Sequence, residues 1–328
     1  MPTWAVTGGG GFIGSNIVAR LVHRGDPVRV VDDFSTGRRS NLEGVRDDIT
    51  LYEGSITDVG LLAEAFDGAD YVLHQAAVAS VQRTVEDPIG TDRVNVSGTL
   101  KVLEAARQAS VERVVYASST AVYGDSEELP KQEDMHPEPK SPYAANKLAG
   151  EYYCRVYNDL YGMETVGLRY FNIFGPRQDP NSDYAAVVPI FVRCALEDRP
   201  ATVFGDGEQT RDFTYVENAV QANLLAAKVS GAAGSVFNIG CGESYTLNTL
   251  LDMLGSILEK RVDREYTSPR AGDVRHSAAD ISRAREILGY SPDVAFEEGL
   301  RHTVAWYSED EKGGAARESD PTGAAAAR

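Results

Sequence analysis

Cysteine is scarce in this chain of 328 residues, which contains only Cys154, Cys194 and Cys241. The three are far apart and form neither a CxxC pair nor the spacing of a metal site, so no bound metal is predicted. No apolar run approaches the roughly 18–20 residues that cross a bilayer. The N-terminus also lacks the charged-then-apolar pattern of a signal peptide. These absences predict a protein of the reducing cytoplasm.

Lysine is scarce as well, and acidic residues outnumber basic ones. Only 7 of the 32 basic residues are Lys, and the 49 acidic residues give a formal net charge of −17 and a pI near 4.7. Such a surface repels phosphate backbones and anionic headgroups, which disfavours general binding to nucleic acid or to a membrane. The composition fits either a surface kept soluble at high salt or ordinary solubility charge.

The first half of the chain alternates short apolar runs with amphipathic segments. Buried strands are expected at residues 4–6, 28–31, 49–52, 71–74, 114–117 and 166–168. Helices are expected at residues 12–24, 61–66, 96–108 and 143–161. This alternation indicates a parallel sheet covered on both faces, and therefore a doubly wound α/β fold of the Rossmann type.

The second half has longer loops rich in Gly, Pro and Asp. Helices are expected there at residues 216–229, 247–258, 281–288 and 296–306. We predict a Rossmann domain over residues 1–171, into whose sheet later segments can cross back, and a smaller α/β substrate lobe over 172–307. The polar, low-complexity residues 308–328 are predicted to form a disordered tail.

A glycine-rich loop follows the first expected strand. Residues 8–11 are all Gly, and Gly14 completes both GxGxxG and GxxGxxG spacings at the start of a helix. Glycine lets the backbone approach a pyrophosphate, and the helix N-terminus supplies N–H groups. Asp32 ends the second strand, where a carboxylate accepts hydrogen bonds from an adenosine ribose, which favours NAD over NADP. Arg38 and Arg39 nearby leave NADP as an alternative.

A YxxxK pattern places Tyr143 and Lys147 on one face of a helix. An ammonium beside the phenol is expected to lower the pKa of Tyr143 and make it a usable base near neutral pH. Ser119 lies at the end of the fifth strand, the edge where parallel sheets bind ligands. Its hydroxyl is a candidate donor to the reacting oxygen, and capping of the strand end is the alternative role.

These motifs together resemble one family, the extended short-chain dehydrogenases/reductases, and within it the NAD-dependent sugar-nucleotide epimerases. The resemblance covers residues 3–307 and rests on TGGGGFIG, on the set of Ser119, Tyr143 and Lys147, and on RYFN at 169–172. It is closest to the UDP-N-acetylglucosamine 4-epimerase subgroup at residues 74–81, 169–189, 205–218 and 272–281. Relatives that dehydrate or decarboxylate their sugar carry an acid after the catalytic Thr, whereas this chain has Ala121 and Val122 there.

The resemblance implies a redox-neutral reaction. Tyr143 would remove the proton from the sugar 4-hydroxyl while C4 gives a hydride to NAD⁺, and Lys147 would hold the nicotinamide ribose. Ser119 and Thr120 would hydrogen-bond the same hydroxyl. The 4-keto sugar would turn in the pocket and take the hydride back on its other face, so NAD should stay bound.

The motif and the resemblance together assign two sets of binding residues. For NAD they are Gly8, Gly11, Phe12, Ile13, Gly14, Asp32, Asp33, Ser55, Ile56, Gln75, Ala76, Ala77, Asn95, Ser118, Tyr143, Lys147 and Tyr170. For the UDP-sugar they are Ser80, Ser119, Thr120, Tyr143, Asn172, Gln178, Ala186, Val187, Val188, Val203, Phe204, Arg211, Arg270, Asp273 and Ser277. Asn172 and the two arginines match positions that contact phosphate, where guanidinium groups bind well.

Ser277 matches the position that carries a bulky Tyr in relatives restricted to UDP-glucose. A small Ser leaves room for an N-acetyl group without excluding glucose, because a few lost contacts are worth only about 1–3 kcal/mol. The predicted substrates are therefore UDP-GlcNAc and UDP-GalNAc, with UDP-Glc and UDP-Gal also open. Arg275 keeps a UDP-uronic acid as an alternative, and a non-catalytic NAD-binding regulatory protein is the alternative from another class.

The tyrosines Tyr152, Tyr153 and Tyr157 recur at helical spacing after the YxxxK pattern. Such a set more often packs in a core or between helices than it binds a ligand. With the helix at 96–108, it is expected to build the four-helix homodimer interface that is usual in the family.

Overall fold

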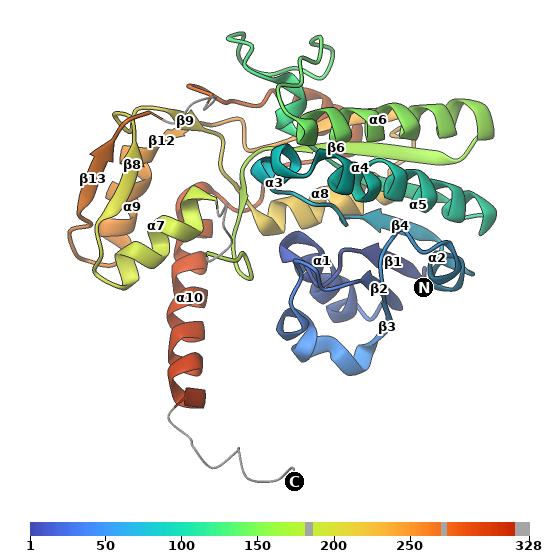
Figure 1. Ribbon diagram of the computed structural model, residues 1–328, viewed down its shortest axis with the longest axis horizontal. Helices are drawn as coiled ribbons and strands as arrows, with labels where there is room; N and C mark the ends of the chain where they lie inside the picture. Colours follow the sequence, from blue (N-terminus) through green and yellow to red (C-terminus); the bar gives the residue numbers. More distant parts are fainter. Residues whose placement is uncertain (181–185, 270–273, 319–328) are drawn as a thin grey trace.

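A seven-stranded parallel sheet forms the centre of the protein, whose computed structural model describes residues 1–180, 186–269 and 274–318. Its strands run in the order β11-β6-β5-β4-β1-β2-β3 (Figure 1). They are β1 (Trp4–Thr7), β2 (Val28–Asp32), β3 (Ile49–Glu53), β4 (Tyr71–His74), β5 (Arg113–Ser119), β6 (Glu164–Tyr170) and β11 (Ser235–Ile239). Every residue of β1 and β4 is buried, as expected for strands covered on both faces.

Helices cover both faces of this sheet. One face carries α1 (Phe12–His23) and α8 (Val216–Lys228), which pack on each other. On the other face lie α2 (Val59–Phe66), α3 (Val81–Glu86), α4 (Pro88–Asn95), α5 (Ser97–Gln108) and α6 (Pro142–Tyr161). A 3₁₀ segment at Arg39–Asp48 packs on α1, and a second one at Thr120–Tyr123 follows β5.

A smaller lobe lies beside the sheet (Figure 1). Its strands pair two by two, β7 (Ile173–Phe174) with β10 (Thr214–Tyr215), β8 (Ala201–Phe204) with β13 (Arg264–Thr267), and β9 (Thr210–Arg211) with β12 (Tyr245–Thr246). Its helices are α7 (Val187–Leu196), α9 (Leu247–Ile257) and α10 (Phe296–Glu318). Both lobes share one large apolar core, so the second lobe is fixed against the sheet.

The doubly wound fold class and its six predicted strands are confirmed. Segments after residue 172 cross back, because β11 pairs with β6 in the central sheet and α8 packs beneath it. The structure adds α3, α4 and α7, which we did not predict, and replaces the expected helix at 281–288 by a short π-helical segment at Ala284–Leu288.

The predicted tail requires a correction at its start. Helix α10 continues to Glu318, so residues 308–318 are helical rather than disordered, while 319–328 lie outside the described residues. Among the described helices, none combines the length and apolar character that a membrane span needs.

Candidate active site

The glycine loop joins β1 to α1 and leaves no room for side chains. A Cβ on Gly8, which has φ +69°, would lie 2.6 Å from the backbone nitrogen of Ala76. A Cβ on Gly14 would lie 2.1 Å from the carbonyl oxygen of Gly8. Helix α1 begins at Phe12 after Gly11, so no side chain covers the N–H groups of its first turn. This bare, positively polarised helix start fits the pyrophosphate of a dinucleotide.

Asp32 holds the same loop from the end of β2. Its Oδ2 accepts a hydrogen bond from the backbone N–H of Gly10 at 2.7 Å, and its Oδ1 accepts one from that of Phe34 at 2.8 Å. Burial raises the pKa of Asp32 above its usual value, and these two N–H groups oppose the rise. Each carboxylate oxygen keeps a second lone pair, so Asp32 can also accept from a ribose hydroxyl.

The two arginines that left NADP open are both engaged with carboxylates. Arg38 forms an ion pair with Asp179, and Arg39 forms one with Glu53. A 2′-phosphate would have to compete with these carboxylates and with Asp32. The arrangement therefore supports NAD.

The predicted NAD residues gather along the carboxyl edge of the sheet. Gln75 follows β4 and its Oε1 accepts from the hydroxyl of Tyr170 at 3.2 Å, at the end of β6. Asn223 of α8 closes a ring, because it donates to the hydroxyl of Tyr170 at 2.7 Å and accepts from Gln75 at 3.0 Å. Sequence reasoning missed Asn223, whose role depends on a contact 148 residues away.

The loop after β4 is fixed from α4. Asn95 both accepts from the N–H of Val78 at 2.8 Å and donates to its carbonyl at 3.1 Å. Ser80 caps α3 by accepting from the N–H of Arg83 at 3.1 Å. Asn95 and Ser80 thus use their side chains to hold the loop that also contains Ala76 and Ala77.

The remaining predicted NAD residues follow β2 and β3. Asp33 accepts from the N–H of Ser35 at 2.9 Å. Ser55 accepts from the N–H and the hydroxyl of Thr57 at 3.2 and 3.0 Å, and Ile56 is buried. Their contacts stabilise the turns at the carboxyl edge of the sheet, where the NAD residues are predicted.

The three predicted catalytic residues meet at the end of β5. Tyr143 hydrogen-bonds Ser119, whose Oγ also accepts from the N–H of Ala121 at 3.2 Å. The capping role considered for Ser119 is thus seen in the structure, and its role toward the reacting oxygen stays a prediction. Lys147 donates from Nζ to the carbonyl oxygen of Ala117 at 2.7 Å, and its Nζ lies 5.8 Å from the centre of the Tyr143 ring.

The expected lowering of the pKa of Tyr143 by Lys147 is wrong for this structure. Burial raises the pKa of Tyr143, and only the hydrogen bond with Ser119 opposes the rise. Burial also lowers the pKa of Lys147 to about 8, because its ammonium lies within the protein against β5. Lys147 is thus partly neutral just above physiological pH.

The start of α6 is anchored at two points. Ser141 accepts from the N–H of Ala144 at 3.2 Å, as expected for an N-cap. The N–H of Tyr143, which the helix leaves without a partner, donates to the hydroxyl of Thr84 on α3 at 3.1 Å. Thr84 was not predicted, since this link joins two helices 59 residues apart.

His74, the last residue of β4, is a buried and neutral side chain near the carboxyl edge of the sheet. Its Nδ1 lies 2.7 Å from the hydroxyl of Thr7, and its Nε2 lies 3.0 Å from that of Thr99. Burial, together with the charge of Lys147, lowers the pKa of His74 to about 3. His74 therefore joins β1, β4 and α5 without carrying charge.

We expect His74 to cause part of the acid unfolding. Between pH 6.5 and about 3 the unfolded chain binds a proton here that the folded chain does not, so stability falls as pH falls. A His74→Asn variant should flatten the plot of unfolding free energy against pH by up to about 1.4 kcal/mol per unit. Urea unfolding between pH 4 and 7 measures this, and parallel plots for the two proteins would contradict it.

The smaller lobe meets the sheet at Asn172 and Asp212. Asn172, with φ +36°, donates from its side chain to the carbonyl of Asp212 at 2.9 Å. The Asp212 carboxylate accepts from the N–H groups of Cys241, Gly242 and Ala279 at 2.8, 3.0 and 3.2 Å. Burial raises its pKa to about 6. Asp212, also missed, ties three separate segments together around the predicted sugar site.

Arg211 and Ser277 both donate hydrogen bonds to the carbonyl oxygen of Thr210. Arg211 donates from Nη1 to the Thr210 carbonyl at 2.8 Å, and the N–H of Ser277 donates to the same oxygen at 3.1 Å. Ser277 is only 8% exposed, and its carbonyl accepts from Ser244 at 2.9 Å. The structure thus brings together two residues that are 66 positions apart.

Val188, Val203 and Phe204, predicted for the UDP-sugar, lie near a cavity of about 380 Å³ or in the core beside it. Phe204 is 37% exposed and lines it, whereas Val203 and Val188 are buried in the core. Ala186 and Val187 form the start of α7, and Gln178 donates to the carbonyl of Ile173 at 3.3 Å. Thr120 begins the 3₁₀ segment after Ser119. Arg270 and Asp273 lie outside the described residues.

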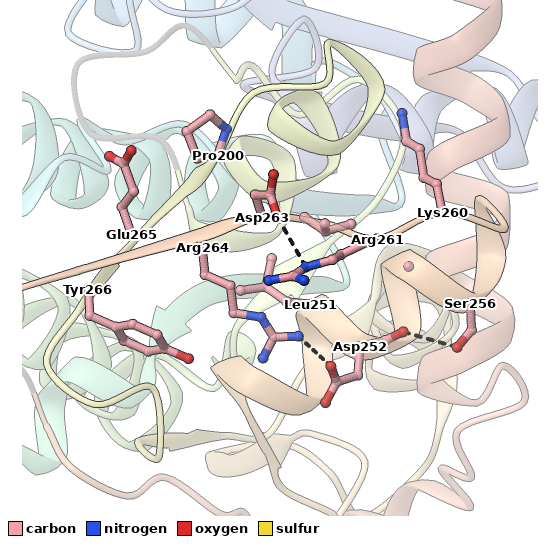
Figure 2. Close-up of a pocket in the computed structure, with 12 residues that line it drawn as sticks. Pro200, Leu251, Asp252, Ser256, Lys260, Arg261, Asp263, Arg264, Glu265 and Tyr266 are labelled. Carbon is pink, nitrogen blue, oxygen red and sulfur yellow. Dashed lines mark hydrogen bonds and ion pairs between the residues drawn. The ribbon is translucent and has the colours of Figure 1, made fainter.

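A larger cleft of about 900 Å³ lies between α9 and β13 in the smaller lobe (Figure 2). Among its described lining residues there is none that we predicted for the site. Its basic groups are matched by carboxylates, since Arg264 pairs with Asp252 and Arg261 with Asp263 (Figure 2). The cleft therefore shows no surplus positive charge for a diphosphate.

Comparison with known proteins finds similar chains. The model of the "NAD dependent epimerase/dehydratase family" matches residues 4–240. A UDP-glucose 4-epimerase of Mycolicibacterium smegmatis is 41% identical over 308 residues, 92% of this chain and 97% of the relative. A UDP-glucuronate 4-epimerase of Thermodesulfobacterium geofontis is 32% identical over 321 residues, 94% and 97% of the two chains.

A solved structure is similar as well. The UDP-N-acetylglucosamine 4-epimerase from Methanobrevibacter ruminantium M1, in complex with UDP-N-acetylmuramic acid, has a TM-score of 0.90 at 39% identity, covering 94% of this chain and 99% of that one. The chain belongs to the NAD dependent epimerase/dehydratase family. The predicted family, the NAD cofactor and the enzyme class of NAD-dependent UDP-sugar 4-epimerases are confirmed.

Proposed function

We propose that the enzyme interconverts UDP-GlcNAc and UDP-GalNAc, and that it also accepts UDP-Glc and UDP-Gal. The observation that carries this choice of sugars is the small, buried Ser277 beside Arg211. A hydroxymethyl side chain there leaves volume for an N-acetyl group, and a shorter substituent at the same carbon would lose only a few contacts.

The residues of this chain supply positioning and proton transfer. NAD, when bound, accepts the hydride from C4 of the sugar and returns it. Tyr143 takes the proton of the sugar 4-hydroxyl and gives it back. Ser119 orients the 4-hydroxyl by a hydrogen bond from its own side-chain hydroxyl. Lys147, whose Nζ lies 5.8 Å from the centre of the Tyr143 ring, would hold the nicotinamide ribose. The glycine loop and Asp32 would hold the dinucleotide, because a Cβ at Gly8 or Gly14 would fill the space it needs.

A UDP-uronic acid is the second candidate, since one relative is named a UDP-glucuronate 4-epimerase. Its carboxylate would require a basic partner, and we considered Arg275 for that role. In the structure Arg275 forms two hydrogen bonds with Asp206, at 2.8 and 2.9 Å, and is 55% exposed. This pairing supports the neutral hexoses over the uronic acid.

Incubating the purified protein separately with UDP-GlcNAc, UDP-GalNAc, UDP-Glc, UDP-Gal and UDP-glucuronate would decide between these candidates. The C4 epimers are resolved by anion-exchange chromatography or by their anomeric proton signals. Conversion of the N-acetylated pair supports the proposal. Conversion of UDP-glucuronate alone would establish the second candidate, and no conversion of any of them would refute both.

A Ser277→Tyr variant should narrow the substrate range. The phenol ring would occupy the volume that an N-acetyl group needs, so kcat/KM for UDP-GlcNAc should fall about 10–200-fold while UDP-Glc changes little. Ser277→Ala is the matched control, because it keeps the space and should leave the ratio of the two sugars nearly unchanged. Equal losses for both sugars in the Tyr variant would show that position 277 does not discriminate between them.

We also propose a homodimer formed through α5 and α6. The outer face of α6 exposes Tyr152, Val156 and Leu160 by 58, 44 and 72%, an apolar stripe at four-residue spacing. Tyr157, by contrast, is buried within the subunit and its hydroxyl donates to Glu104 of α5 at 3.2 Å. Its role is therefore packing of α5 on α6.

A charge placed in this stripe should separate the subunits. Burying a carboxylate without a partner is costly, so a Leu160→Glu variant is expected to elute as a monomer where the unmodified protein is a dimer. Light scattering coupled to gel filtration measures the mass of each. Val59→Glu, at an exposed apolar position on α2, is the matched control and should not change the mass. A monomeric unmodified protein would refute the dimer.

A further inference from the structure

A third ionisable residue follows the catalytic pair along α6. Tyr143, Lys147 and Glu151 are spaced by four residues, so they lie on one face of the helix. The Glu151 side chain is only 4% exposed, and its partner Arg169 on β6 is 5% exposed. Neither the glycine motif nor the YxxxK motif explains why a carboxylate is buried directly behind Lys147.

Both carboxylate oxygens of Glu151 accept hydrogen bonds. Arg169 donates from Nε to Oε1 at 2.9 Å and from Nη2 to Oε2 at 2.7 Å. The hydroxyl of Ser118 on β5 donates to Oε1 as well. Losing either partner would leave an uncompensated buried charge, so each side chain depends on the other.

Arg169 is itself held in one position. Its Nη1 donates to the carbonyl of Glu133 at 3.2 Å, and its guanidinium lies 4.7 Å from the centre of the Tyr123 ring. The hydroxyl of Tyr123 in turn donates to Asn238 of β11 at 2.6 Å. The pair thus connects α6 to β5, β6 and β11 under the catalytic residues.

Several ionisable groups surround the ammonium of Lys147. On α6 they are Tyr143 and Glu151, on β5 Tyr116 with its ring centre 5.2 Å from Nζ, and on β4 His74. Burial lowers the pKa of Lys147, and Glu151 is the charge that opposes this fall. His74 is neutral above about pH 3, so it adds no positive charge at working pH.

We propose that Glu151 and Arg169 form a positioning pair that holds Lys147 in its charged state and β5 in register with it, and so sets the upper pH limit of catalysis. The inference rests on the proposed function. It assigns the pair no contact with substrate or cofactor. It does predict opposite effects when either charge is removed.

The test compares the pH dependence of kcat in two single variants. Glu151→Gln removes the anion, so Lys147 should lose its proton more easily. The alkaline limb of the profile, where kcat falls as pH rises, should therefore move down by about one pH unit. Arg169→Met leaves the anion without its cation, so the limb should move up. The double variant Glu151→Gln/Arg169→Met removes both charges and should return the limb close to its original position. It keeps the test usable where a single variant folds poorly.

Arg113 and Glu164 provide a matched control. They begin β5 and β6, whereas Ser118 and Arg169 lie near the other ends of these two strands. Arg113 is buried like Arg169, its side chain being 5% exposed, and it also pairs with a glutamate. Glu164→Gln should lower stability without moving the alkaline limb. Limbs that stay fixed, or that move the same way in both single variants, would overturn the proposal and leave the pair a purely structural role.

A second measurement does not depend on turnover. The ¹³C chemical shift of the Lys147 Cε, assigned by its loss in a Lys147→Met version, reports the protonation of the Lys147 ammonium. In Glu151→Gln this transition should move down in pH relative to the double variant, because the carboxylate that opposes the effect of burial is gone. An unchanged transition would contradict the proposal. If the unmodified protein lacks epimerase activity, the proposed function fails, and this titration still tests the pair.

Discussion

A Tyr143→Phe variant is expected to lose epimerase activity by roughly 10²–10⁴-fold, the usual contribution of a positioned acid–base group. Phenylalanine keeps the ring and its packing but removes the hydroxyl that hydrogen-bonds Ser119. The backbone link from residue 143 to Thr84 is unaffected, because it uses the main-chain N–H. The loss should therefore appear in kcat, with KM and melting temperature nearly unchanged.

Progress curves with saturating UDP-sugar measure the loss, and the NAD content after acid precipitation shows whether cofactor is retained. Tyr152→Phe is the matched control, because Tyr152 lies on the same helix with its side chain 58% exposed. Its activity should stay within about twofold of the unmodified enzyme. A Tyr143→Phe enzyme that keeps more than a tenth of the activity would show that another group moves the proton.

The predicted strands of the sheet agree with the structure because buried parallel strands are short apolar runs. Strand β11 was missed for a reason that lies in its pairing. It contains Asn238, and its place depends on pairing with β6, about 70 residues earlier in the chain. The helices α3 and α4 were missed because their buried residues are polar, Thr84 in α3 and Thr91 and Asn95 in α4, so neither shows an apolar helical period.

The site divides in the same way. The glycine loop and the Tyr143–Lys147 pair are encoded in contiguous residues, so local motifs suffice to find them. The partners that hold them, such as Thr84, Asn223 and Arg169, depend on which elements the fold brings together. The i, i+4 rule placed Lys147 and Tyr143 on one helix face, but the acceptor that Lys147 takes, the carbonyl of Ala117, belongs to a neighbouring strand.

Gly14→Ala is expected to abolish tight NAD binding and to destabilise the fold. The added Cβ would lie 2.1 Å from the carbonyl oxygen of Gly8 and 2.9 Å from the Cα of Gly9, both in backbone that cannot yield without opening the loop. Opening it also breaks the 2.7 Å hydrogen bond from Gly10 to Asp32. We expect at least a 100-fold loss of NAD affinity and an overpacking cost of about 1–3 kcal/mol or more.

Cofactor fluorescence titration and thermal unfolding measure the two effects separately. Gly44→Ala is the matched control, because nothing lies within 4 Å of its added Cβ, and its affinity and stability should stay close to those of the unmodified protein. Added NAD should raise the melting temperature of the control and leave that of Gly14→Ala nearly unchanged, since only a state that binds ligand is stabilised by it. Equal stabilisation of both variants would show that the pyrophosphate does not depend on this loop, and the dinucleotide site would have to be placed elsewhere along the sheet edge.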